Sequence, residues 1–241
     1  LELTIPAPFD GAAYVYSAQK VLDGARIGVT ENVTARPGTL VANMLGVWLF
    51  GYADHGPKIV QGVLQLAALT LSFVALLRLF GAAGAVTGTA LAALMLSAPL
   101  VAKYGNVKEQ YMIAFTMSAV GCLVLHRLSG RRWLLPVAGG LLSWVPLFKE
   151  TGFSAIIAVA VFLAFEVLAG TRTARQLRAD AALLLAGAAL ALLPLYVWMI
   201  AAGAAVASWP YGFVVSFLAG GGDNYISGAR EIYPLAEQAR R

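Results

Sequence analysis

Charge is the scarcest property of this 241-residue chain. Asp, Glu, Lys and Arg together make up 12% of the residues, about half the share found in ordinary soluble domains. The apolar types AVILMFWYC make up 60%, and the mean hydropathy is +0.77. A soluble domain of this length has too little interior to bury so much apolar surface. The composition therefore excludes a soluble enzyme and a disordered chain, and it predicts an integral membrane protein.

Cysteine and the familiar soluble-enzyme motifs are also lacking. The single cysteine, Cys122, cannot form an internal disulfide, which excludes a disulfide scaffold. The chain has no Walker loop, no GxGxxG and no CxxC. His55 and His126 are far apart, with no carboxylate at metal-ligand spacing, so we expect both at helix boundaries. The net charge of +5 comes mostly from short loops between apolar runs, which indicates membrane topology rather than nucleic-acid binding.

Long charge-free intervals predict an all-α, polytopic transmembrane bundle. A spanning helix needs about 20 apolar residues. We expect about six helices within a 57–201 bundle, at 57–80, 84–102, 107–126, 133–148, from 151 onward, and 180–201. The 133–148 helix is short, about 24 Å at 1.5 Å per residue, against a membrane core of ~30 Å. Its length predicts that Lys149 lies below the membrane surface, inside the protein.

The loops between these helices alternate in charge. One set holds seven basic residues, and the other holds three. The positive-inside rule assigns the richer set to the cytoplasm, so the poorer set faces outside. The richer set is Arg78, Arg127, Arg131, Arg132, Arg172, Arg175 and Arg178, and the poorer set is Lys103, Lys108 and Lys149.

The two ends of the chain differ from the bundle. Within 1–56 we expect an outer-face loop with two juxtamembrane helices, an amphipathic one over 11–24 capped by Asp10 and an apolar one over 39–52. On the first helix, one face carries Tyr14, Ala18, Val21 and Leu22, and the opposite face carries Ala13, Tyr16 or Ser17, Lys20 and Asp23. Within 202–241 we expect an interfacial segment carrying Trp209, Tyr211 and Phe213, and the start of an outer loop. Because the chain starts at Leu1 rather than Met, we expect a fragment.

Polar residues expected at the outer helix ends form the strongest chemical signal. They come from separate segments, and a helix bundle brings such ends together around one cavity. Arginine and lysine stabilise phosphate charge, and a carboxylate accepts a proton. The alternative is that they are ordinary interfacial charges. The set is Asp10, Glu31, Arg36, Lys103, Tyr104, Lys108, Glu109, Lys149 and Glu150.

A series of short motifs accompanies these charges. The first part of the chain contains Asp10-Gly11-Ala12-Ala13-Tyr14, Ala18, Leu22-Asp23-Gly24, Ala35-Arg36-Pro37-Gly38-Thr39-Leu40 and Leu49-Phe50-Gly51. This order resembles the first outer loop of GT-C membrane glycosyltransferases, of the protein mannosyltransferase and aminoarabinose transferase type. The segment from Trp144 to Gly152 resembles the helix–Lys–Gly–helix segment of that family. Gly11 and Gly38 depart from the pattern, at positions where a second acid and a second proline are usual.

The resemblance implies transfer of a sugar from a polyprenyl-phosphate donor to a lipid, glycan or protein acceptor. The reaction would occur at the outer, periplasmic face of a bacterial inner membrane. The resemblance makes Asp10 the residue that activates the acceptor or aids a divalent metal, Arg36 and Lys149 the phosphate contacts, and Glu109 a second acid or metal ligand. It also implies substrate binding by Tyr14 and Lys103. Because the family's first and C-terminal helices are not represented, this stretch alone is expected to be inactive.

Two other functions remain open. A transporter or permease is the first, because Gln61 and Gln65 lie one helical turn apart in an expected span. The second is a non-catalytic membrane assembly subunit.

Overall fold

The fold is helical throughout the part that is described. The computed structural model describes residues 9–31, 35–205 and 208–212. Across these ranges the only β-type pairing is an isolated bridge between Ile27 and Glu31. The elements are α1 (Phe9–Leu22), α2 (Pro37–Phe50), α3 (His55–Ser97), α4 (Pro99–Ala102), α5 (Lys108–Ser129), α6 (Leu134–Phe148), η1 (Glu150–Gly152), α7 (Phe153–Leu168) and α8 (Ala174–Ala201). The all-α prediction is confirmed.

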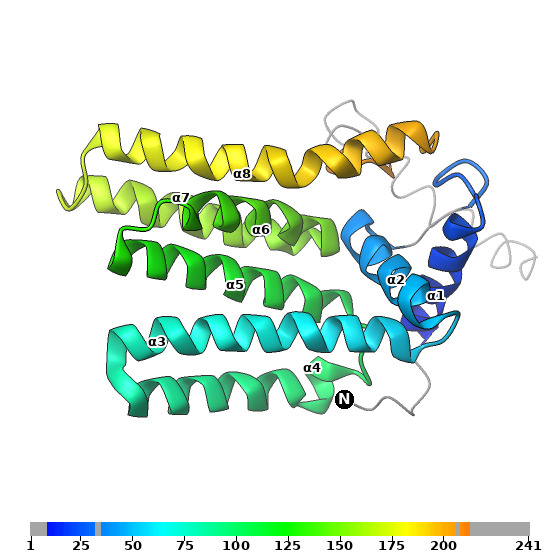
Figure 1. Cartoon of the computed structure of the whole chain (residues 1–241), viewed down its shortest axis with the longest axis horizontal. Helices are drawn as coiled ribbons and strands as arrows, with labels where there is room; N and C mark the ends of the chain where they lie inside the picture. Colours follow the sequence, from blue (N-terminus) through cyan, green and yellow to red (C-terminus); the bar gives the residue numbers. More distant parts are fainter. Residues whose placement is uncertain (1–8, 32–34, 206–207, 213–241) are drawn as a thin grey trace, which may run out of the picture.

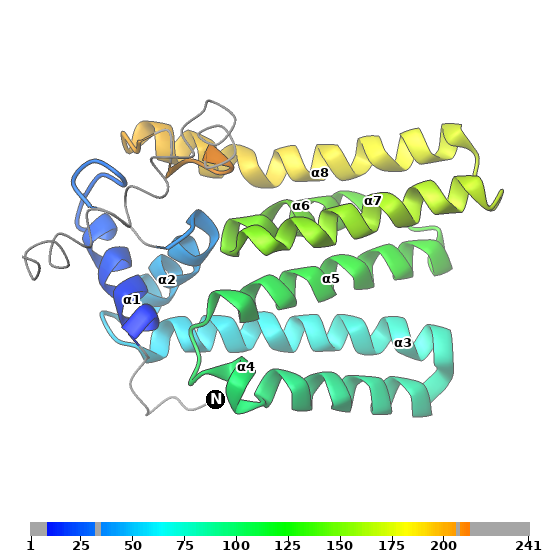
Figure 2. The same ribbon diagram turned by 180° about the vertical axis from the view of Figure 1, so that it is seen from behind.

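Four helical segments are long and apolar enough to cross a membrane: α3, α5, the continuous η1–α7 segment and α8. They run side by side along the long axis of the molecule in both views (Figures 1 and 2). The chain is thus built as a multi-pass membrane protein. Helix α6, with 15 residues, is shorter than a full span, as its charge-free interval predicts.

Helix α3 turns back on itself at Gly81. That residue has φ 73° and ψ −175°, which a residue with a side chain rarely adopts. The two arms lie antiparallel (Figure 1), where the sequence predicts helices over 57–80 and 84–102. The second of those predictions runs too far, because Ala98 is extended at ψ 134°. The residue before a proline favours that conformation, so Pro99 ends the arm and starts α4.

Helix α8 begins six residues earlier than predicted. Thr173 and Gln176 form a capping box, with Gln176 N donating to Thr173 Oγ1 at 3.2 Å and Thr173 N donating to Gln176 Oε1 at 3.0 Å. This reciprocal pairing satisfies two backbone N–H groups at the helix start. Arg175 and Arg178 therefore lie in the first turns of the helix instead of in a loop.

Helices α6 and α8 cross at two glycines. A Cβ on Gly139 would lie 1.9 Å from the Leu184 carbonyl oxygen, and one on Gly187 would lie 1.9 Å from that of Pro136. Only glycine allows backbones to approach so closely, as in other small-residue contacts between membrane helices. The crossing fixes the position of α6 and thus of its last turn.

Helices α1 and α2 lie across one end of the bundle (Figures 1 and 2). Each starts and ends two residues before its predicted range; Pro37 at the first turn suits a helix start, and Gly51 at φ 80° ends α2. Asp10 falls inside the first turn of α1 rather than at the N-cap. The predicted inner face of α1 is buried at Tyr14, Ala18 and Val21. The pattern fails at two positions, since Leu22 is exposed and Ser17 is buried and bonded to Glu31.

Trp209 and Tyr211 pack against the protein core instead of standing apart from it. Both contact the cluster that includes Leu147 of α6 and Met199 of α8. The Tyr211 hydroxyl donates to the Ser143 carbonyl. Phe213 and the remainder of the predicted interfacial segment lie outside the described residues.

Candidate functional site

A cavity of about 420 Å³ lies where α1 meets α4 and the start of α5, and we call it the charged pocket. Four of the six predicted site residues line it: Asp10, Tyr14, Lys103 and Glu109. Lys108 lines it as well, whereas Glu31 lies elsewhere, in the turn after α1. The full lining is Asp10, Gly11, Tyr14, Pro99, Leu100, Lys103, Tyr104, Asn106, Val107, Lys108 and Glu109.

Helix α1 supplies one wall of the charged pocket. Asp10 and Tyr14 are one turn apart and so share a helix face. Asp10 is exposed, and it benefits from the positive end of the helix dipole. Tyr14 is 5% exposed; burial, together with the charges of Asp10 and Glu109, raises the pKa of its phenol to about 12. Tyr14 is therefore a neutral hydrogen-bond donor at neutral pH.

A left-handed turn forms the opposite wall. Lys103, Tyr104, Gly105 and Asn106 have φ angles of 42°, 67°, 89° and 55° in succession. Each residue with a Cβ costs roughly 1–2 kcal/mol in this conformation, so other contacts must hold it. Sterically strained backbone of this kind often accompanies functional sites.

Asn106 holds the turn in place. Its Nδ2 donates to Asn43 Oδ1 at 2.8 Å and to the Gly11 carbonyl at 3.2 Å. Its Oδ1 accepts from the Tyr111 hydroxyl at 3.2 Å. Asn106 thereby connects α1, α2 and α5 behind the charged pocket. Asn106 was not among the residues predicted for the site, although the Gly105-Asn106 dipeptide is typical of a turn.

Lys149 reaches the charged pocket through Glu109. It follows the last residue of α6, and its Nζ lies 2.7 Å from Glu109 Oε1 on α5. Glu109 lines the charged pocket, whereas Lys149 does not. The side chains are 33% and 26% exposed, so the pair is within reach of solvent. Helix α6 ends next to the start of α5, which places Lys149 beside Glu109.

Arg36 lies further from the charged pocket than Lys149 and belongs to a second ion pair. It immediately precedes α2, and its guanidinium pairs with Glu150 of η1, the neighbour of Lys149. Like Lys149, it is not part of the lining. Two cations and two carboxylates thus form adjacent pairs beside the charged pocket.

A metal centre is not supported by the side chains present. Among the described residues, no three His, Cys, Asp or Glu side chains are grouped to hold a metal ion. Asp10 and Glu109 line the charged pocket together, but Glu109 is already engaged by Lys149. We therefore derive no chemical step through a metal.

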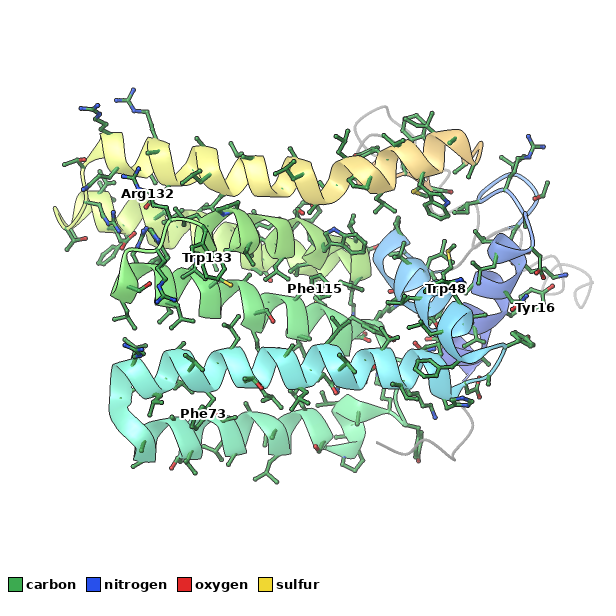
Figure 3. All side chains as sticks on the ribbon, viewed as in Figure 1. Tyr16, Trp48, Phe73, Phe115, Arg132 and Trp133 are labelled. Carbon is green, nitrogen blue, oxygen red and sulfur yellow. The ribbon has the colours of Figure 1, made fainter. Side chains whose placement is uncertain are left out.

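Another ionic cluster lies at the opposite end of the bundle. From the sequence, Arg127 was used only to orient the chain in the membrane. Arg127 of α5 binds both oxygens of Glu166 on α7, at 2.9 and 2.7 Å, and Asp180 of α8 at 2.7 Å. His126 is buried beside it, with Nδ1 3.1 Å from the Arg131 carbonyl and Nε2 3.9 Å from Asp180. Figure 3 places Arg132 and Trp133 at this end and Tyr16 and Trp48 at the other.

Comparison with known proteins finds no matching family model, no matching curated protein and no matching solved structure.

Proposed function

We propose that this chain belongs to a membrane glycosyltransferase of the GT-C type. It would move a sugar from a polyprenyl-phosphate donor to a lipid, glycan or protein acceptor at the outer face of a bacterial inner membrane. The observation that carries this proposal is the composition of the charged pocket. A carboxylate (Asp10), a neutral phenol (Tyr14) and two ammonium groups (Lys103 and Lys108) line one cavity at the end of a multi-pass bundle.

These groups match the charges that develop during sugar transfer. Asp10 takes the proton from the acceptor hydroxyl while the oxygen of that hydroxyl bonds to the anomeric carbon of the sugar. The bond from that carbon to the phosphate oxygen breaks, and its electron pair stays on the phosphate. Lys103 and Lys108 stabilise the added negative charge, and Tyr14 donates a hydrogen bond without carrying charge of its own.

Arg36 and Lys149 bind the donor phosphate by releasing the carboxylates with which they pair, Glu150 and Glu109. Each pairs with a carboxylate, and each pair remains partly exposed to solvent. An exposed pair is worth only ~0–1 kcal/mol, so a phosphate group can replace the carboxylate at low cost. Arginine offers a planar, two-pronged contact to phosphate, whereas lysine acts as a point charge.

Replacing Asp10 tests the proposal most directly. Asp10→Asn in the full-length protein keeps the shape of the side chain and removes the base. We expect transfer from a polyprenyl-phosphate sugar to fall about 10²–10⁴-fold with the melting temperature unchanged. Asp23→Asn is the matched control, because Asp23 is exposed just beyond the other end of α1 and does not line the charged pocket. Near-normal turnover of Asp10→Asn would remove Asp10 from the mechanism.

One observation favours the transporter as a second candidate. Gln61 and Gln65 line another cavity, of about 430 Å³, between the arms of α3. Polar side chains within a span often mark a solute path. Uptake of a labelled neutral solute into proteoliposomes, abolished by Gln65→Met and unaffected by Asp10→Asn, would favour transport over transfer.

A further inference from the structure

The cavity between the arms of α3, which we call the amide cavity, adjoins the charged pocket. Its lining includes Gln61, Gln65, Leu66 and Leu69 from the first arm and Leu96 and Ser97 from the second. Pro99 and Tyr104 line both cavities. Among the described elements, the short α4 and the left-handed turn therefore lie between them.

Backbone groups determine which atoms the glutamines present to the amide cavity. The backbone N–H of Val107 can only donate, so the oxygen of Gln61 must accept from it, at 2.9 Å. The Leu96 carbonyl can only accept, so the nitrogen of Gln110 must donate to it, at 3.0 Å. Gln110 then has its oxygen facing Gln65, which must donate its own nitrogen.

One donor and one acceptor are left over. Within the described residues, the side chain of Gln61 makes only the bond to Val107, and that of Gln65 makes only the bond to Gln110. The nitrogen of Gln61 and the oxygen of Gln65 therefore bond to none of the described residues. Gln61 is 3% exposed, so its free nitrogen has little access to water other than through the cavity that it lines.

This pair of groups is suited to hydroxyl groups. A hydroxyl both donates and accepts, which matches a free amide nitrogen and a free amide oxygen one helical turn apart. The glutamines and serine in the lining carry no charge, in contrast to the lysines and carboxylates of the charged pocket. The two cavities therefore select different chemistry: neutral hydroxyls in one, and phosphate in the other.

The amide cavity opens within the membrane-spanning part of α3. Gln65 lies ten residues after the start of α3 at His55, about 15 Å along the helix. Leu66, beside it in the lining, is 66% exposed on the outside of a membrane-spanning helix. Leu69 and Leu96 add apolar surface to the lining. An occupant with a polar head and an apolar chain fits both parts.

Resting on the proposed function, we propose that the amide cavity binds the acceptor, and that this acceptor is a membrane lipid whose head group carries several neutral hydroxyls. One hydroxyl is held between Gln61 and Gln65. A second hydroxyl of the same head group extends past Tyr104 into the charged pocket. This hydroxyl gives its proton to Asp10 while the hydroxyl oxygen bonds to the anomeric carbon of the sugar. The electron pair of the broken bond goes to the donor phosphate in the charged pocket.

Photolabelling of the full-length protein in phosphatidylcholine nanodiscs tests this site. The probe is a monoglucosyl diacylglycerol with a diazirine in one acyl chain, and the control lipid is the same molecule with every hydroxyl methylated. We expect the free-hydroxyl probe to label peptides covering residues 61–69 and 96–105. Gln65→Met should lower that labelling about fivefold, the effect of one lost hydrogen bond.

Two further variants separate binding from folding. Gln61→Met removes both the free amide donor and the oxygen that accepts from Val107, so labelling and the melting temperature should both fall. Gln65→Met leaves the Val107 bond in place, so it should lower labelling with little change in the melting temperature. Thr70→Val is the matched control, because Thr70 is on the same arm, is exposed and does not line the amide cavity. Equal labelling by the two lipids, or undiminished labelling of both glutamine variants, would overturn the proposal.

Release of sugar from the donor to water, measured in the same samples, distinguishes this inference from the proposed function. Loss of transfer to the lipid with retained release in Gln65→Met supports the acceptor site. If sugar transfer proceeds and the two lipids label the protein equally, the acceptor site is overturned and the proposed glycosyltransferase function stands. Hydroxyl-dependent labelling in a protein that neither releases nor transfers sugar removes the acceptor role and overturns the proposed function.

Discussion

At one end of the bundle, Lys149 and Glu109 form a pair whose side chains are 33% and 26% exposed. At the opposite end, Arg127 bridges Glu166 and Asp180, with side chains that are 17%, 14% and 9% exposed. The first pair borders a cavity of about 420 Å³. The second cluster joins α5, α7 and α8 directly.

The difference in burial determines how readily each charged group can change its partner. A buried charge that loses its partner is costly, whereas a partly exposed charge can change partners. Helix α7 depends on the buried cluster in particular, because an apolar groove of about 410 Å³ lies between α5 and α7 next to Arg127. The Arg127–Glu166 contact is thus a main attachment of α7 at that end.

Removing Arg127 should have the largest effect on stability. Arg127→Ala leaves the buried Asp180 and the partly buried Glu166 without their main partner, and we expect a loss of about 3–5 kcal/mol in the free energy of unfolding. Unfolding in detergent by an SDS titration measures this loss. Arg132→Ala is the matched control, because Arg132 is exposed at the same end.

A charge-free replacement sharpens that test. The triple variant Arg127→Met, Glu166→Gln and Asp180→Asn removes the three central charges together. Arg172, whose Nη1 lies 3.8 Å from Asp180, is 26% exposed and stays accessible to water. The triple variant should recover most of the stability lost in Arg127→Ala, because replacing a whole buried cluster is often neutral. Failure to recover would mean that the specific ionic contacts, rather than the uncompensated charge, hold α7.

Removing Lys149 should cost little stability and more activity. Lys149→Met breaks a partly exposed pair, so we expect a loss of at most ~1 kcal/mol in the free energy of unfolding. If the chain acts as the proposed glycosyltransferase, the apparent KM for the phosphate donor should rise about tenfold or more, since hydrogen bonds to charged groups are worth ~1.5–3 kcal/mol. A stability loss as large as that of Arg127→Ala would erase the distinction between the two ends.

The smallest effect concerns the titration of Tyr14. Its pKa is raised by burial, with Asp10 and Glu109 adding to the shift, to about 12 from the usual 10.0. A raised pKa means that the folded state keeps the proton that the unfolded state loses. Its contribution to stability is therefore complete below pH 10 and is lost as the pH rises toward 12. The difference in absorbance titration between wild type and Tyr14→Phe should show a phenol that ionises near pH 12, and a midpoint near 10 would contradict this.

Local sequence patterns predicted much of the helical architecture. The charge-free intervals predicted the short α6, and the spacing of Tyr14, Ala18 and Val21 predicted the buried face of α1. These features depend on neighbours within a turn or two. Helix ends were less predictable, because Ala98 and Thr173 end or start helices through proline geometry and capping contacts that hydropathy does not register.

Apolar composition and helical periodicity alone determined the fold class, because burial and membrane insertion depend on residue type along short stretches. Only the tertiary structure decided which charges meet. Lys149 and Glu109 are 40 positions apart, and they pair because the Gly139–Gly187 crossing sets the position of α6. The free atoms of Gln61 and Gln65 likewise depend on backbone groups of Val107 and Leu96. Such partners lie far along the chain, and only packing brings them within hydrogen-bond distance.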